Sequence, residues 1–298
     1  MTITESQLDT WSKRPDPGPS AATYQRIRSV LEGAWQLAGR SVEIYLQGSY
    51  GNDTNTRADS DVDVVAELTS TFHSDTTNLP PGDLARYQSD RIPATYHWDE
   101  YLEDVIDALR DAFGASAVDT SGNKSIKVAR AAGRLPVDVV PAMHYRRYYQ
   151  YPATGSPRYV EGIRFLTRRE RRAVINYPKL HIANGQTKNK STPEYKASVR
   201  MIKNARRVAC DLGLVPTDAA PSYFLECLLY NAPDELFTTV RSTSYLELLS
   251  WALDAVIEER ALVCGNGIVP LFGASPEQWD RGDAMATLSG LVKLWREL

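Results

Sequence analysis

The chain has 298 residues, of which 43% are hydrophobic and 24% are charged, and its formal net charge at pH 7 is -3. This length suffices for one or two domains with a sizeable core, and the slightly negative charge argues against a large surface for binding duplex DNA. No run approaches the roughly 18 uninterrupted apolar residues of a membrane span, and residues 1–15 lack the basic start and apolar centre of a secretion signal. A cytoplasmic protein is therefore expected.

The first 20 residues are polar and rich in proline, which predicts a loop before a helix over about residues 21–38. A strand, a tight turn and a second strand should follow between residues 42 and 68, because apolar residues alternate up to Gly48 and Ser49 and resume at Val62. Gly48 would let the backbone approach a phosphate closely, and Ser49 would add a hydroxyl and a backbone N–H.

Asp61 and Asp63 come at the start of this second strand, where both side chains should point to the same face. Two adjacent carboxylates repel each other, so their burial is costly unless a divalent cation neutralises them. Oxygen ligands suit Mg²⁺ or Mn²⁺, and Mg²⁺ typically takes one or two carboxylates together with substrate phosphates. An Asp-x-Asp pair alone is more often a loop or a calcium-like acidic patch, but its combination with the Gly-Ser turn favours a nucleoside triphosphate site.

Asp138 lies within another apolar, strand-like segment, residues 135–141. An isolated aspartate in such a run needs a partner. As a third carboxylate it would complete a two-metal site, in which one ion activates an attacking hydroxyl and the other clamps a triphosphate.

The remaining elements are mostly helical. Residues 71–95 contain several Pro, Gly and Asp residues and should form a surface excursion near the site. Helical spacing predicts helices over residues 98–113, 222–229, 245–263 and 276–298. The basic residues between 162 and 207 are expected mostly on solvated helix faces. Cys210, Cys227 and Cys264 are predicted to be core residues, and the four scattered histidines are assigned no catalytic role.

These motifs together resemble the polymerase-beta-like nucleotidyltransferases, and the chain from about Val42 to Leu298 resembles one branch of them, the bacterial cGAS/DncV-like nucleotidyltransferases of anti-phage signalling. Residues 175–181, 184–190 and 195–206 look like the region that links the catalytic core to its helical half, and residues 221–231 resemble the helix that closes the donor pocket. The resemblance implies an α/β (α+β) protein: a core with a mixed sheet over residues 1–160, packed on a helical C-terminal lobe over residues 161–298.

The resemblance also implies roles for individual residues. Asp61, Asp63 and Asp138 would be the catalytic metal ligands, and Lys203 would reach the donor triphosphate. Nucleotide contacts are expected from these residues: Gln47, Gly48, Ser49, Asn176, Lys203, Ser222 and Tyr223.

Three of these assignments have plain structural alternatives. Ser222 would contact donor phosphates or simply cap its helix, and Tyr223 would stack on a base or belong to the core. Asn176 would select uracil, as in the pyrimidine-using CdnE-like clade, or would be a turn residue before Tyr177 and Pro178. Asn184 and Asn189 lie nearby and compete for the selecting role.

The implied activity is the Mg²⁺- or Mn²⁺-dependent condensation of two ribonucleoside triphosphates into a cyclic dinucleotide, with release of pyrophosphate. A uridine-containing product is favoured, such as cyclic UMP-AMP or cyclic di-UMP, and a separate effector would sense it during defence against phage. The enzyme is expected to be a monomer, and activation by double-stranded DNA is not expected because no Cys/His cluster could build a zinc insertion. Two alternatives stay open: a nucleotidyltransferase acting on RNA, a small molecule or a protein, and an antitoxin-like binding module without catalysis, which the intact carboxylates disfavour.

Overall fold

The computed structural model describes residues 3–57, 60–275 and 277–297 and divides the chain into two compact units. The sheet unit contains Gly18–Gln47 and Asp59–Pro178, and the helical unit contains Met1–Pro17, Gly48–Ala58 and Lys179–Leu298. This division differs from the expected boundary at residue 160. Two strands continue the sheet as far as residue 176, while the N-terminus and the Gly48–Ala58 segment join the helical unit.

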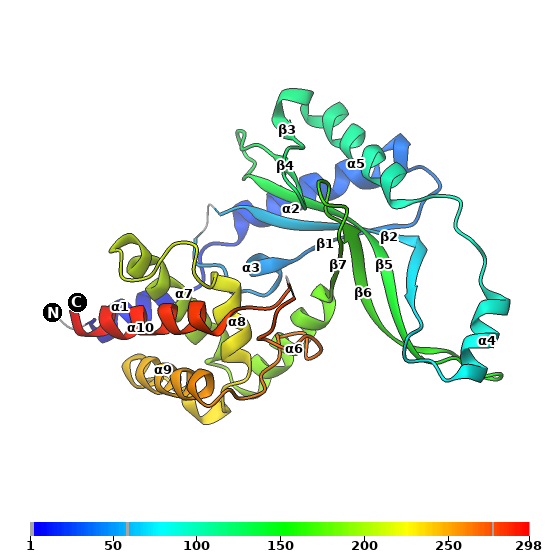
Figure 1. Cartoon of the computed structure of the whole chain (residues 1–298). Helices are drawn as coiled ribbons and strands as arrows, with labels where there is room; N and C mark the ends of the chain where they lie inside the picture. Colours follow the sequence, from blue (N-terminus) through cyan, green and yellow to red (C-terminus); the bar gives the residue numbers. More distant parts are fainter. Residues whose placement is uncertain (1–2, 58–59, 276, 298) are drawn as a thin grey trace. The chain divides into compact units, whose positions relative to one another are not determined.

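The expected mixed sheet is present in the sheet unit (Figure 1). Its strands in the described part of the chain are β1 (Val42–Leu46), β2 (Val62–Asp75), β3 (Val118–Asp119), β4 (Ile126–Val128), β5 (Val137–Gln150), β6 (Arg158–Leu166) and β7 (Ala173–Asn176). The order is β1-β2-β5-β4-β3, and β6 pairs with both β5 and β7. β2 and β5 run parallel and the other pairs are antiparallel. β5 pairs with β4 along its first residues and with β6 along its last ones.

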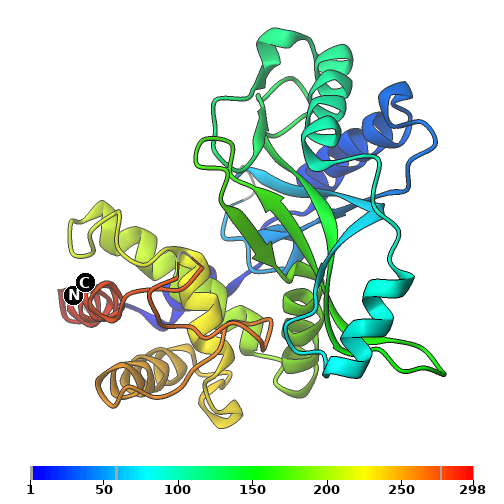
Figure 2. The ribbon, with the colours of Figure 1, turned by 45° about the vertical axis from the view of Figure 1, so that its right-hand side comes forward.

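Helices α2 (Gly18–Glu32) and α5 (Trp98–Phe113) lie side by side against one face of this sheet (Figures 1 and 2). α5 has the expected bounds, and its N-terminus is fixed because Glu100 Oε2 accepts the His97 backbone N–H at 2.9 Å. The helix expected over residues 21–38 instead ends at Glu32 and is followed by a short 3-10 helix, η1 (Trp35–Leu37). A second 3-10 helix, η2 (Ala115–Ala117), follows α5.

Residues 71–95 lie at the surface as expected, with only Leu79 buried, but they contain regular secondary structure that the sequence did not indicate. β2 continues to Asp75, and α4 (Pro81–Asp90) follows with Pro81 at its first position. Pairing with β5 along nearly its whole length extends β2 into the polar residues after Leu68, because backbone hydrogen bonds to a neighbouring strand do not depend on side-chain polarity.

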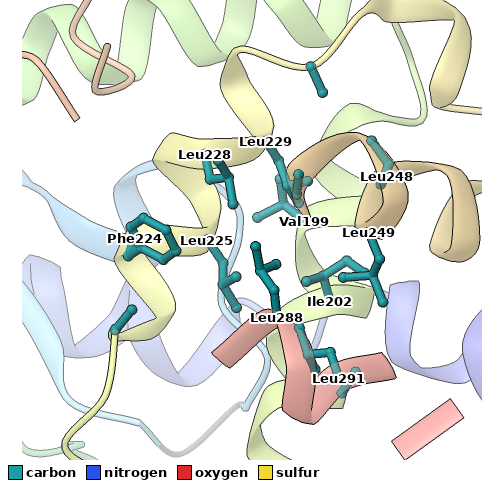
Figure 3. Packing of buried hydrophobic residues seen from close by; sticks show 14 of the residues in the cluster. Val199, Ile202, Phe224, Leu225, Leu228, Leu229, Leu248, Leu249, Leu288 and Leu291 are labelled. Atoms are coloured by element: carbon teal, nitrogen blue, oxygen red, sulfur yellow. The ribbon is translucent and has the colours of Figure 1, made fainter. Parts of the chain in front are cut away.

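The helical unit consists of α1 (Glu5–Ser12), α3 (Gly48–Gly51), α6 (Pro178–Ser191), α7 (Tyr195–Asp211), α8 (Ser222–Tyr230), η3 (Asp234–Leu236), α9 (Arg241–Ile257) and α10 (Arg281–Glu297). Its core forms where α7, α8, α9 and α10 meet, and Figure 3 shows Ile202, Leu225, Leu249 and Leu288 converging there. Each is buried, and full burial of such a side chain stabilises the fold by roughly 1.5 to 3 kcal/mol.

The N-terminal segment also contributes to this core, which corrects the expected loop over residues 1–20. α1 forms because Leu8 and Trp11 share one face, and both are buried in the helical unit. Thr4 caps the helix by accepting the Gln7 N–H, and Asn204 of α7 donates to the Trp11 carbonyl at 2.9 Å.

The last two predicted helices are present with different bounds. α9 ends at Ile257, and an irregular segment with a β-bridge between Val263 and Pro270 replaces the predicted end at residue 263. α10 begins at Arg281, while the predicted ends of that helix, Pro276 and Leu298, lie outside the described residues. The cysteines are free thiols, and Cys227 and Cys264 are buried as predicted. Among the described helices, none combines the length and the apolar character needed to cross a membrane.

Candidate active site

The candidate catalytic residues of the sheet unit are aligned by strand register. Asp63 of β2 lies opposite Asp138 of β5, and Asp138 lies opposite Lys127 of β4. Residues paired in this way point to the same face of a sheet, so the three side chains form one row across three strands. Asp61 precedes Asp63 by two residues and is exposed, and the Gln47 backbone N–H donates to the Asp63 carbonyl at 3.0 Å. The parallel pairing of β2 and β5 therefore brings the predicted acidic residues together.

Asp138 is electrostatically distinct within this row. Burial raises its pKa; the Lys127 ammonium opposes this, the Asp61 carboxylate adds to it, and a hydrogen bond with Ser125 opposes it again. The net pKa lies above the ordinary value of an aspartate. A carboxylate with a raised pKa is a stronger base than an ordinary aspartate.

The donor set fits a hard divalent cation, since three carboxylates supply only oxygen ligands and would repel one another without one. No group of three His, Cys, Asp or Glu side chains in the described part of the chain is by itself arranged to hold a metal ion.

Gly48 and Ser49 begin the one-turn helix α3, where a tight turn had been expected. Gly48 has a φ of 60°, a backbone conformation that glycine adopts without strain. The turn is closed by two backbone bonds: the Asn52 N–H donates to the Gly48 carbonyl at 3.0 Å, and the Thr54 N–H donates to the Ser49 carbonyl at 2.9 Å. Gly48–Thr54 therefore behaves as one compact piece of backbone.

Asp53 links this segment to other residues of the helical unit. Its carboxylate lies 2.7 Å from Arg14 and 3.5 Å from Lys196, and its carbonyl accepts a bond from Arg200 at 2.7 Å. Asp53 has a φ of 57°, which aspartate tolerates better than most residues do.

Lys203, the predicted phosphate-binding lysine, lies in a buried cluster around Glu226. Its Nζ is 3.4 Å from Glu226 Oε2 and 3.3 Å from Thr54 Oγ1, and only 6% of the lysine is exposed. His181 Nε2 is 2.9 Å from Glu226 Oε1. Two cationic side chains thus face one carboxylate.

The protonation of this cluster follows from its contacts. Burial alone would raise the pKa of Glu226, but its hydrogen bond with His181 and the charge of Lys203 lower it to about 2. Burial would likewise lower the pKa of His181, but hydrogen bonds with Cys227 and Glu226 outweigh burial and raise it to about 9. The cluster therefore carries a net positive charge at neutral pH, beside the segment that contains Gly48 and Ser49.

Ser222 and Tyr223 open α8. Ser222 is exposed and does not cap the helix, because the N-cap residue is Pro221 and no side chain bonds there. Tyr223 is half-buried, its ring stacks on His181 at a centroid distance of 5.2 Å, and its hydroxyl lies 3.1 Å from His181 Nδ1. The tyrosine ring also lies 5.7 Å from the ring of Trp279, so it has two aromatic neighbours within the protein.

Asn176 is the last residue of β7, in the sheet unit. Its Oδ1 accepts the Tyr177 backbone N–H at 2.9 Å, so the amide retains one oxygen lone pair and the Nδ2 donors for other partners. The competing residues are engaged in the helical unit: Asn184 donates to the Gly265 carbonyl at 3.0 Å, and Asn189 accepts the Lys196 N–H at 3.0 Å.

Sequence reasoning did not identify Lys127, His181 or Glu226. A glutamate within the apolar run of residues 224–229 was the available signal for Glu226, since a buried acid needs partners. Lys127 and His181 have no local signal, because a strand register and helix packing create their contacts.

A mixed sheet with in-register aspartates, in a chain that also contains a Gly-Ser turn, defines a nucleotidyltransferase core. Residues 183–296 match the model of the cGAS/DncV-like nucleotidyltransferase C-terminal helical domain. The chain is 40% identical to the cyclic UMP-AMP synthase of Rhodothermus marinus over 99% of this chain and 98% of that protein. It is 34% identical to the cyclic nucleotide synthase CdnE01 of Staphylococcus haemolyticus over the whole of both chains.

The solved structure of the Rhodothermus marinus CdnE c-UMP-AMP synthase with Apcpp and Upnpp superposes with a TM-score of 0.88, covering 99% of this chain and 97% of that one at 40% identity. The chain therefore belongs to the family of cGAS/DncV-like nucleotidyltransferases, and the predicted fold class and enzyme class are confirmed.

Proposed function

We propose that this enzyme condenses two ribonucleoside triphosphates into a cyclic dinucleotide that contains uridine, such as cyclic UMP-AMP or cyclic di-UMP. The register that places Asp63 beside Asp138, with Asp61 two residues ahead, carries the proposal for the chemistry. Full-length similarity to a cyclic UMP-AMP synthase supports the choice of product.

In each of two rounds, a ribose hydroxyl attacks the α-phosphorus of a bound triphosphate. A new P–O bond forms, the bond to the β-phosphate breaks, and pyrophosphate leaves. Asp138 accepts the proton of the hydroxyl. Asp61, Asp63 and Asp138 would hold Mg²⁺ or Mn²⁺, which when bound neutralises phosphate charge and favours ionisation of the hydroxyl.

The other predicted residues bind and orient the nucleotides. Gly48 and Ser49 approach the donor phosphates with backbone and hydroxyl groups, Gln47 contributes its side chain, and Ser222 adds a second hydroxyl. Lys203 supplies positive charge from within the Glu226 cluster. Tyr223 supports a base, and Asn176 reads its edge.

The setting follows from the chemistry. Ribonucleoside triphosphates are abundant in the cytoplasm, where we place the enzyme as a monomer. Its product would act as a second messenger for a separate effector protein in defence against phage, without activation by double-stranded DNA.

The test is to incubate the purified protein with all four labelled ribonucleoside triphosphates and Mg²⁺ or Mn²⁺, followed by phosphatase and mass spectrometry of the resistant products. A resistant cyclic product containing uridine is expected. A product that forms only with an added RNA, small molecule or protein acceptor would contradict the proposal.

Asp61→Asn is expected to reduce turnover by several orders of magnitude while leaving the melting temperature nearly unchanged, because Asp61 is exposed and its role is to ligate metal. Asp107→Asn, on the exposed face of α5, is the matched control and should retain full activity. Retained activity in the Asp61 variant would exclude the metal assignment.

A further inference from the structure

Glu226 connects the Gly48–Thr54 segment, for which we propose phosphate binding, to helices of the helical unit. Its Oε1 accepts a hydrogen bond from Asn52 Nδ2 at 2.7 Å, and its Oε2 accepts one from Thr54 Oγ1 at 2.6 Å. On the helix side it contacts His181 of α6 and Lys203 of α7, and it is itself part of α8. One side chain thus joins three helices to the segment that follows Gly48 and Ser49.

The contacts of Glu226 with Asn52 and Thr54 also fix the position of Ser49. The same two residues that donate side-chain bonds to Glu226 also donate their backbone N–H groups to the carbonyls of Gly48 and Ser49. Moving Asn52 or Thr54 therefore moves the turn that contains Ser49. Both residues are buried, as is Glu226, of which 2% is exposed.

Stability alone is a poor reason for this arrangement. Well-packed apolar residues often replace a buried ionic cluster without loss of stability, because the cost of removing charges from water offsets their attraction. An apolar residue at position 226 could not accept directed bonds from both Asn52 and Thr54. The carboxylate at position 226 is therefore better explained by the two bonds that fix the position of the Gly48–Thr54 segment.

We propose that Glu226 is a positioning residue for nucleotidyl transfer, which holds Gly48 and Ser49 in the geometry that receives the donor phosphates. The inference rests on the proposed function of Gly48 and Ser49. Glu226 acts through Asn52 and Thr54 and does not itself touch the substrate.

Thr54→Val tests the segment side of the network. It removes the hydrogen bond from Thr54 to Glu226 and the 3.3 Å contact of the same hydroxyl with Lys203, and it leaves the contacts of the carboxylate with His181 and Lys203 in place. We expect kcat/KM for the nucleoside triphosphates to fall by roughly tenfold or more, the effect of losing a hydrogen bond to a charged group. Thr54→Ser retains the hydroxyl and should restore kcat/KM to within about twofold of the wild type.

Thr287→Val is the matched control, because Thr287 is fully buried in α10 of the same unit and its Oγ1 makes no hydrogen bond within the described part of the chain. It should leave kcat/KM unchanged. A second readout, independent of turnover, is the rise in melting temperature caused by a non-hydrolysable triphosphate analogue with Mg²⁺. This rise should be at least halved in Thr54→Val and unchanged in Thr287→Val.

The outcomes separate this inference from the proposed function. Equal kcat/KM and equal analogue-induced shifts in Thr54→Val and Thr287→Val would overturn the positioning role. If the wild type made no cyclic product but the analogue still raised its melting temperature, the proposed function would fail and the shifts would decide the positioning role. If the wild type made no cyclic product and the analogue stabilised neither the wild type nor any variant, both would be overturned.

Discussion

At the scale of single residues, the chemistry of the candidate site was largely readable from residue types. The acidic residues at positions 61, 63 and 138 stood out because carboxylates at strand positions need a partner, and register places two of them side by side. Lys127 did not stand out, because a lysine in a short polar stretch is ordinarily solvated. Its pairing with Asp138 exists only once β4 and β5 are in register.

Asn176 provides a prediction about base selection. Asn176→Ser shortens the side chain and removes the Nδ2 donors, so the share of uridine in the product should fall severalfold, with total turnover less affected. Chromatography of products made from an equimolar mixture of the four triphosphates measures this share. An unchanged nucleotide profile would remove Asn176 from the selecting role.

His181 provides a prediction about pH. Its pKa is raised from 6.5 to about 9 in the folded protein, so its contribution to stability is fully present below pH 6.5 and is lost as the pH rises through about 9. The groups that face it are Glu226, Tyr223 and Cys227. The melting temperature should fall by several degrees between pH 7 and 10, since each kcal/mol shifts it by about 2 to 4 °C in a domain of this size.

His181→Gln removes this titrating group and is the comparison for the pH experiment. The decline between pH 7 and 10 should be shallower in the variant than in the wild type, whatever its absolute melting temperature. Parallel curves would show that His181 is neutral in the folded protein.

At the scale of elements, the helices and strands with a strong periodic pattern were predicted well, and their ends were not. α5 has an apolar face and a capping glutamate, both local features, and its bounds match. β2 exceeded its predicted length because pairing with β5 extends it. α1 was missed because its two buried apolar residues, Leu8 and Trp11, gain their partners only from the helical unit.

Gly290 in α10 tests the packing of these elements. A Cβ at this position would lie 2.5 Å from the Leu214 carbonyl oxygen, which is backbone and cannot turn aside. Gly290→Ala should therefore destabilise the protein by about 1 to 3 kcal/mol, measured by denaturant unfolding. Gly185→Ala in α6 is the matched control, since its Cβ would meet nothing within 4 Å and the change should stabilise the helix by up to about 1 kcal/mol. Equal stabilities of the two variants would contradict this packing.

At the scale of the whole molecule, each of the two units is built from segments that are not consecutive in the sequence. The first and the last described segments of the chain belong to the helical unit, and so does the segment after Gly48, which comes between two strands of the sheet. Predicted boundaries followed the sequence from one end to the other and therefore placed the Gly-Ser turn with the strands that flank it.

The sequence by itself indicated the strands around the Gly-Ser turn and the acidic residues, because strand periodicity, turn chemistry and the cost of burying carboxylates act between near neighbours. The mixed α/β class followed from the family resemblance. Only the tertiary structure decided three features: the row formed by Asp63, Asp138 and Lys127, the contacts of Gly48–Thr54 with the rest of the helical unit, and the Glu226 cluster. These depend on strand register and on contacts between residues such as Asn52 and Glu226, which are distant in sequence. No local pattern encodes such contacts, since each residue alone is compatible with many partners.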